Sequence, residues 1–304
     1  MAGVRRSSLR EEEAAARSNG KRMKRKTPES IRIIDPVDMP YIQVVYGTNV
    51  TNEFSRHAHH RFCVGSVSKG ARVFLEAGSS TIIPENAVFA VNADTAHTCK
   101  PQCREGHDYF AFCIDTEKIR EVASQISDKA QDVPRVRSVL LCDAQLASEA
   151  HEMFFLLCRD SPFLQRQSAF ISMISRLIIR HGDSSPTFRR TGPQPGAINR
   201  VRDFIEAHFA ESISLEELSR TACLSPFHFH RLFLKNTGVS PHEYLVRSRI
   251  RKATELILQG HYLAGVAAET GFADQSHFTR AFKRIIGVTP GRYLQLNGKR
   301  NIGS

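Results

Sequence analysis

Histidine and cysteine side chains gather in the first half of this 304-residue chain, at spacings that suit a binding site. The candidates for such a site are His57, His59, Cys63, His97 and Cys99. Cys103 and His107 follow at four-residue steps. Imidazole and thiolate ligands together favour Zn²⁺ or Cu(I) over Mg²⁺ or Ca²⁺. Because clustered thiolates are also open to oxidation, the same residues are compatible with redox sensing.

A second chemistry is indicated near the C-terminus, where one stretch of the sequence occurs twice. Residues 228–241 read HFHRLFLKNTGVSP and residues 277–290 read HFTRAFKRIIGVTP, with seven of fourteen positions identical and no gap. Each copy predicts a short helix, a tight turn, and a second helix that has an N-cap residue before it and a glycine after it. These residues are Ser225 and Gly238 in the first copy, and Asp274 and Gly287 in the second. The plan is that of a helix-turn-helix, whose second helix fits the major groove of DNA.

Each second helix has an apolar face and a polar, cationic face. The residues expected to face the core are Phe229, Leu232 and Phe233, and then Phe278, Ala281 and Phe282. The residues expected to face outward are Phe227, His228, His230, Arg231 and Lys235, and then Gln275, Ser276, Arg280, Lys283 and Arg284. Arg231 and Arg280 share one repeat position, and arginine is the usual bidentate reader of guanine. We therefore predict that both helices bind DNA.

Residues 242–260, between the two copies, predict one long helix. Its apolar positions are Leu245, Ile250, Ala253 and Ile257, and its other face carries Arg247, Arg249, Arg251 and Lys252. Such a helix would hold the two units at a fixed distance. A distance of about 34 Å, one turn of DNA, would let a single chain read two successive major grooves.

The remaining elements must position these two sets of residues. Residues 31–115 contain short runs rich in Val, Ile, Phe and Tyr between turn residues, which predicts a β-sandwich or barrel. Amphipathic helices are expected after Asp115 and over 143–159 and 162–181, packed on the barrel or paired with a second subunit. Residues 182–197 are rich in Gly, Pro, Ser and Thr and predict a linker. The predicted fold class is α+β, with two domains: a barrel with trailing helices, then an all-α domain.

Charge is concentrated at the two ends of the chain. The net charge is +11; residues 1–30 carry nine Lys/Arg and four Glu, and residues 196–304 carry fifteen Lys/Arg and nine Asp/Glu. A basic domain attracts the phosphate backbone of DNA because binding releases counterions. We expect no membrane span and no signal peptide, and therefore a cytoplasmic protein. Its seven irregularly spaced cysteines are then expected to be reduced thiols.

The C-terminal third of the chain resembles a known family. Residues 271–293, GFADQSHFTRAFKRIIGVTPGRY, are similar to the signature of the AraC/XylS family of bacterial transcription regulators. The resemblance implies base contacts from the first half of each second helix. Carried over by motif position, the residues are Phe227, His230, Arg231, Gln275, Ser276 and Arg280. It also implies double-stranded promoter DNA and RNA polymerase as partners, and action as an effector-responsive activator.

The family commonly joins this module to a cupin-like sensor barrel and to dimerising helices, so a small-molecule effector and a homodimer are expected. Residues 52–70 and 82–99 resemble the two cupin motifs. Enzymatic cupins hold a metal there with His-x-His, Glu and a further His. His57, His59 and His97 fit that pattern, and Cys63 stands in the place of the glutamate.

Three kinds of stimulus stay open at this point: a small organic effector, a metal ion such as Zn²⁺ or Cu(I), and oxidation. A metal-dependent cupin enzyme is the remotest alternative, because the glutamate is missing and a DNA-binding module follows. The expected divisions are a disordered basic tail at 1–30, the effector-binding domain at 31–181, the linker at 182–197, the DNA-binding domain at 198–296 and a tail at 297–304.

Overall fold

Antiparallel strands fill most of residues 30–114 and form two sheets in the computed structural model, which describes residues 28–159, 161–183 and 195–297. The strands are β1 (Ser30–Ile34), β2 (Ile42–Val50), β3 (Phe54–His57), β4 (Phe62–Lys69), β5 (Arg72–Glu76), β6 (Ser79–Ile83), β7 (Val88–Val91), β8 (His97–Pro101), β9 (His107–Ile114) and the later β10 (Leu140–Leu141). One sheet has the order β1-β2-β9-β4-β7-β10, and the other has the order β3-β8-β5-β6. The predicted β-domain is confirmed.

The two sheets enclose an apolar interior of their own. Buried side chains from both sheets meet there, among them Phe74 on β5, Phe89 on β7 and Tyr109 on β9. In the smaller sheet, β3 pairs with β8 so that His57 lies opposite His97. The antiparallel register therefore brings together two histidines that are forty residues apart in the sequence.

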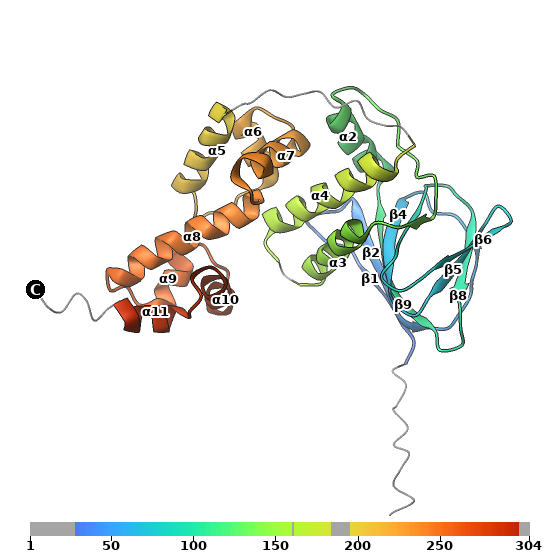
Figure 1. The fold of residues 1–304 in the computed structure, drawn as a ribbon, viewed down its shortest axis with the longest axis horizontal. Coiled ribbons are helices and arrows are strands. Elements are labelled where there is room, and N and C mark those ends of the chain that lie inside the picture. The colour runs from blue at the N-terminus through green and yellow to red at the C-terminus, as the bar shows by residue number, and fades with distance from the viewer. Residues whose placement is uncertain (1–27, 160, 184–194, 298–304) are drawn as a thin grey trace, which may run out of the picture.

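Three helices cover the outer face of the six-stranded sheet (Figure 1). They are α2 (Thr116–Ser127), α3 (Ala144–Cys158) and α4 (Phe163–His181). The predicted apolar faces are buried, as Met153 on α3 and Ile174 on α4 illustrate. Helix α4 begins one residue later than expected, because Pro162 is its N-cap.

Helices make up the C-terminal part of the described chain. They are α5 (Pro195–Ala207), α6 (Leu215–Ala222), α7 (Pro226–Thr237), α8 (Pro241–Leu258), α9 (Leu263–Glu269), α10 (Gln275–Ile286) and α11 (Pro290–Asn297). The first helix-turn-helix unit is α6 with α7, and the second unit is α9 with α10. Most of the expected linker, residues 184–194, lies outside the described residues, and its last part is helical because α5 begins at Pro195. The expected terminal tails also lie almost entirely outside the described residues.

Local sequence signals explain the ends of α7 and α10. The Ser225 hydroxyl accepts a hydrogen bond from the backbone N–H of His228, and the Asp274 carboxylate accepts one from that of His277. Both helices end at a glycine in the left-handed region, with φ of 74° at Gly238 and 91° in the second copy. These capping interactions satisfy backbone groups that a helix end leaves unpaired.

The hydrophobic cores divide the chain in an unexpected place. One continuous core contains residues of α2, α3 and α4 together with residues of α5, α6 and α7. A separate core joins α8, α9 and α10. The first helix-turn-helix unit therefore shares its core with the sensor domain, whereas the second unit does not. Within the described residues, no helix is long and apolar enough to cross a membrane.

Candidate functional sites

The second helix-turn-helix unit presents its predicted contact residues to solvent. Gln275, Ser276 and Arg280 on α10 are all exposed. On the opposite face, Phe278 and Phe282 are buried and hold α10 on its own domain. The first turns of α10 therefore form a polar, cationic surface of the kind that enters a major groove.

The first unit differs, and here three predicted exposures are wrong. Phe227 is only 3% exposed and His230 only 8%, although both were expected to face outward. His228, also expected outside, is 6% exposed. Burial lowers the pKa of His230 to about 4, so its imidazole is neutral at pH 7. Of the three contacts predicted on α7, Arg231 alone is exposed.

Helix α2 of the sensor domain covers the start of α7. The Gln125 side-chain oxygen accepts a hydrogen bond from the backbone N–H of Phe227 at 3.2 Å. The Asp128 carboxylate lies 2.9 Å from Nε2 of His228. The physical reason for the wrong prediction is thus a contact between residues about a hundred positions apart, which the helical periodicity of α7 does not contain.

Arg249 on α8 is a further correction, because it was expected on the outward basic face. It is 8% exposed, and its guanidinium donates to the carbonyl oxygens of Phe209 (2.7 Å) and Glu211 (2.8 Å). It also lies over the ring of Phe272 in the second unit. Arg249 therefore connects the loop between α5 and α6 to α8 and to the second unit.

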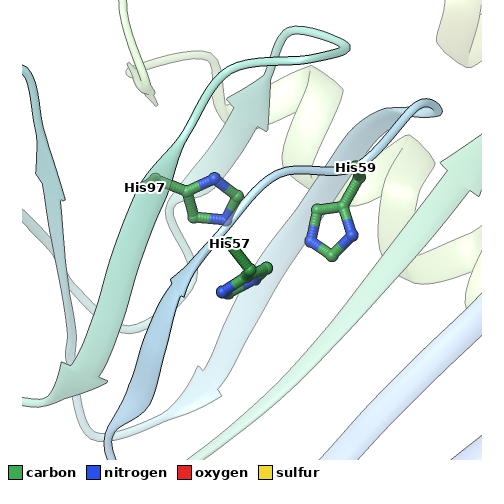
Figure 2. Close-up of side chains that lie close together, drawn as sticks. All are labelled: His57, His59 and His97. Atoms are coloured by element: carbon green, nitrogen blue, oxygen red, sulfur yellow. The ribbon is translucent and has the colours of Figure 1, made fainter.

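In the sensor domain, three of the predicted site residues come together. Figure 2 shows the imidazoles of His57, His59 and His97 facing one another, from the end of β3, the loop after it and the start of β8. One ring nitrogen from each lies within 4.8 Å of the others. The histidine part of the predicted cluster thus forms a compact group of three imidazoles.

Backbone carbonyls orient two of these rings. Nδ1 of His57 donates to the carbonyl of Ser55 (2.6 Å), and Nδ1 of His97 donates to the carbonyl of Thr95 (2.9 Å). A carbonyl only accepts, so Nδ1 carries the proton and Nε2 is left as the lone-pair donor. Burial also lowers the pKa of His97, and lowers that of His59 to about 4. Neutral, oriented imidazoles are the form that binds a metal ion.

The two cysteines of the predicted site have other partners. Cys63 lies opposite Cys113 in the β4–β9 pairing, and its thiol contacts the sulfur of Cys113 at 3.2 Å. This hydrogen bond, followed by burial, raises the pKa of Cys63. Cys63 is therefore held as a thiol and is not part of the group of three imidazoles. Cys99 is buried and lies 2.9 Å from Nη2 of Arg72.

Arg72 is a residue of the sensor interior that the sequence reasoning missed. It is 6% exposed, and its guanidinium lies between the two sheets, 4.0 Å from the ring centre of Tyr109 and 5.1 Å from that of Phe74. Its Nε has no hydrogen-bond partner, and Arg72 forms no ion pair within the described parts of the chain. Both ring nitrogens of the buried His107 also lack a partner there. The available signal was a lone arginine opening the apolar run RVFLE.

Two family models match the chain. Residues 40–178 match an AraC-like ligand binding domain, and residues 218–296 match a helix-turn-helix domain. The chain is 27% identical over 238 residues to the HTH-type transcriptional regulator YbfI of Bacillus subtilis, covering 78% of this chain and 86% of that protein.

Other relatives match the C-terminal third of the chain. LumQ of Photobacterium leiognathi, described as a probable transcriptional regulator, is 39% identical over 31% of this chain and 38% of its own length. RhaS of Escherichia fergusonii, described as a transcriptional activator, is 35% identical over 32% of this chain and 36% of its own. The chain therefore belongs to the AraC/XylS family of transcription regulators, with a ligand-binding domain followed by a helix-turn-helix DNA-binding domain.

Proposed function

We propose that this regulator reads two successive major grooves with α7 and α10, and that Arg231 and Arg280 make equivalent base contacts. The observation that carries the proposal is the exposed face of α10, where Gln275, Ser276 and Arg280 stand at one end of a helix anchored by its opposite face. Helix α7 has a capping residue, two core phenylalanines and an arginine at the matching repeat positions. RhaS is described as a transcriptional activator, which supports activation of transcription. Contact with RNA polymerase and a cytoplasmic location are part of the proposal.

Removal of the α10 arginine tests this proposal. Arg280→Ala is expected to weaken binding to a site selected from a DNA library by about 1–3 kcal/mol and to relax one base position. Arg32→Ala, which removes an exposed arginine from β1 of the sensor, is the matched control and should leave the site preference unchanged. Unchanged affinity and base preference in Arg280→Ala would show that α10 does not read DNA in this orientation.

The effector is proposed to be a small molecule with an anionic group that binds between the sheets. Arg72 supports this, because a buried guanidinium that has no acidic partner among the described residues leaves an uncompensated charge and an unused donor. The surrounding aromatic rings of Phe74 and Tyr109 would contact the apolar part of the same ligand. A carboxylate would form a bidentate pair with the arginine.

A metal ion is the second candidate effector, favoured by the convergence of three imidazoles. His57, His59 and His97 fit a Zn²⁺ ion with three nitrogen ligands and an open position. A bound Zn²⁺ would supply a Lewis-acidic position for an anionic group. Because the relatives are described as transcription regulators, the sensing role is preferred here to that of a metal-dependent enzyme.

One melting experiment separates the two effectors. After EDTA treatment, the full-length protein is heated with ZnCl₂, with benzoate or octanoate, and with benzyl alcohol or octanol as neutral counterparts. An anion site predicts that the carboxylates raise the melting temperature, that the neutral alcohols do not, and that Arg72→Met abolishes the rise. A ligand present at a hundredfold its Kd would increase the free energy of unfolding by about 2.7 kcal/mol. A metal site predicts a rise with ZnCl₂ that His97→Ala abolishes.

The helices α3 and α4 are the proposed surface for a homodimer. Phe155 on α3 is 54% exposed, and its apolar surface would be buried in such a dimer. Sedimentation of the full-length protein would give the mass directly.

A further inference from the structure

Matching positions of α7 and α10 differ in their exposure to solvent. Phe227 and His230 on α7 are buried, whereas their counterparts on α10, Ser276 and Thr279, are exposed and half-buried. The two helices have the same length, and each has a capping side chain before it, two core phenylalanines and a glycine after it. The difference therefore comes from what lies over the helix, since α7 contacts α2 and α4 of the sensor and α10 packs against α8, α9 and α11.

The sensor holds both helices of the first unit by polar contacts. At the start of α7, Gln125 accepts from a backbone N–H, and Asp128 pairs with His228. At the start of α6, the buried Gln167 of α4 accepts from the backbone N–H of Leu215 at 2.8 Å and donates to Glu216. The Gln125 and Gln167 side-chain oxygens each satisfy a backbone N–H that a free helix end exposes, so the sensor substitutes for solvent at both helix starts.

This contact is incompatible with groove entry by α7. The major groove is about 12 Å wide and admits one helix, and base contacts come from the N-terminal residues of that helix. Here those residues lie against α2, and the shared hydrophobic core of α2, α4, α6 and α7 holds them there. Figure 1 shows α7 on the side of its domain that faces α2 and α4. The arrangement leaves α10 accessible while α7 is covered.

We propose that the contact of α2 and α4 with the first helix-turn-helix unit is an autoinhibitory lock. In the locked conformation the protein contacts DNA through α10 alone, and release of α7 adds the second groove. This inference rests on the proposed function, namely that α7 reads DNA. A ligand opens such a lock only if it binds the released conformation more tightly than the locked one.

A short path connects the sensor interior to the lock. Strand β9 carries Tyr109, whose ring lies against the Arg72 guanidinium. The same strand ends at Ile114, and α2 begins directly afterwards at Thr116. A ligand that displaces Tyr109 would therefore act on the strand from which the covering helix extends.

The test is a lock-breaking double variant, Gln125→Lys with Asp128→Asn, in the full-length chain. It places a cation at the N-terminus of α7 and removes the anion there, both unfavourable to the helix dipole, and asparagine tolerates the left-handed backbone of residue 128. Glu117→Lys, at the exposed far end of α2, raises the net charge equally and is the matched control. The DNA probe is a duplex selected from a random library with the double variant.

The double variant is expected to bind that duplex at least about tenfold more tightly than wild type without any effector. Its hydroxyl-radical footprint should cover two successive grooves, where wild type and Glu117→Lys protect one. Equal affinities and footprints for the double variant and Glu117→Lys would overturn the lock, provided that circular dichroism shows both folded.

A third substitution separates failure of the lock from failure of the proposed function. In the double variant, Arg231→Ala should remove the second-groove footprint, and loss of affinity without any change of footprint would refute reading by α7. A second measurement needs no lock-breaking variant. Amide hydrogen exchange of wild type should show residues 225–230 still covered by α2 in a complex whose footprint covers one groove, and leaving α2 in a complex whose footprint covers two. Continued contact between α2 and α7 in a two-groove complex would overturn the lock.

Discussion

The two helix-turn-helix units are near copies in sequence but not in environment. In both, a capped helix packs two phenylalanines on its own domain and ends at a glycine. The hydrophobic core of the first unit also contains residues of the sensor helices. The core of the second unit is formed by α8, α9 and α10. The comparison teaches that the helix pattern decides which residues anchor α7 and α10, whereas a distant part of the chain decides which residues are accessible.

The largest expected effect tests whether the two cores are separate. Phe229→Ala and Phe278→Ala remove the same repeat residue, each fully buried, and each should cost about 3–5 kcal/mol in the free energy of unfolding of its core. Because Phe229 belongs to the core shared with the sensor, its loss should also lower the protection of α2 and α4. Calorimetry and hydrogen exchange of both variants would show this.

The Phe278→Ala variant is expected to affect only the second unit in the same measurements. Phe278→Ala should open α9 and α10 early while the sensor keeps its exchange rates. If instead both variants increase hydrogen exchange in the sensor equally, the two units unfold as one cooperative body and the two cores are not separate.

The helix faces that build the scaffold could be predicted from the sequence. Phe229, Phe233, Phe278 and Phe282 follow the spacing of a helix face, and that spacing is a local property of the chain. The proximity of the three histidines could also be predicted. His57 and His59 are separated by one residue, and antiparallel pairing places His97 opposite His57. Local periodicity and strand pairing therefore accounted for both scaffolds.

The residues that the sequence reasoning placed wrongly depend on contacts between distant segments. Phe227 is covered by a helix about a hundred residues earlier, and Cys63 meets Cys113 from the neighbouring strand. An aromatic residue at a position expected to face water was the one available signal for the first contact. Nothing local indicated the second, which follows from the β4–β9 register.

An intermediate effect on stability is expected at Arg249. Its side chain connects two carbonyls of the loop after α5 to the ring of Phe272 in the second unit. Arg249→Met should destabilise the protein by about 1–3 kcal/mol, because two buried carbonyls lose their donor. Arg247→Met, exposed on the same helix, should change stability by less than about 0.5 kcal/mol. Urea unfolding measures the stability of both variants. Equal changes would indicate that Arg249 lies on the exposed basic face of α8, as the sequence predicted, and not in the buried contact.

The smallest effect sharpens the comparison at the two helix starts. Ser225→Ala removes the cap of α7, a change that typically costs about 1 kcal/mol. The Ser225 bond to His228 is long, 3.4 Å, and Gln125 of α2 already accepts from a neighbouring N–H of the same helix end. We therefore expect a smaller cost in wild type than in a Gln125→Ala background, where the hydroxyl is the remaining side-chain acceptor known at that end. Urea unfolding of the four proteins in this double-mutant cycle gives the coupling. Equal costs in both backgrounds would mean that α2 covers α7 without supporting its helix end, so that the lock acts by occlusion alone.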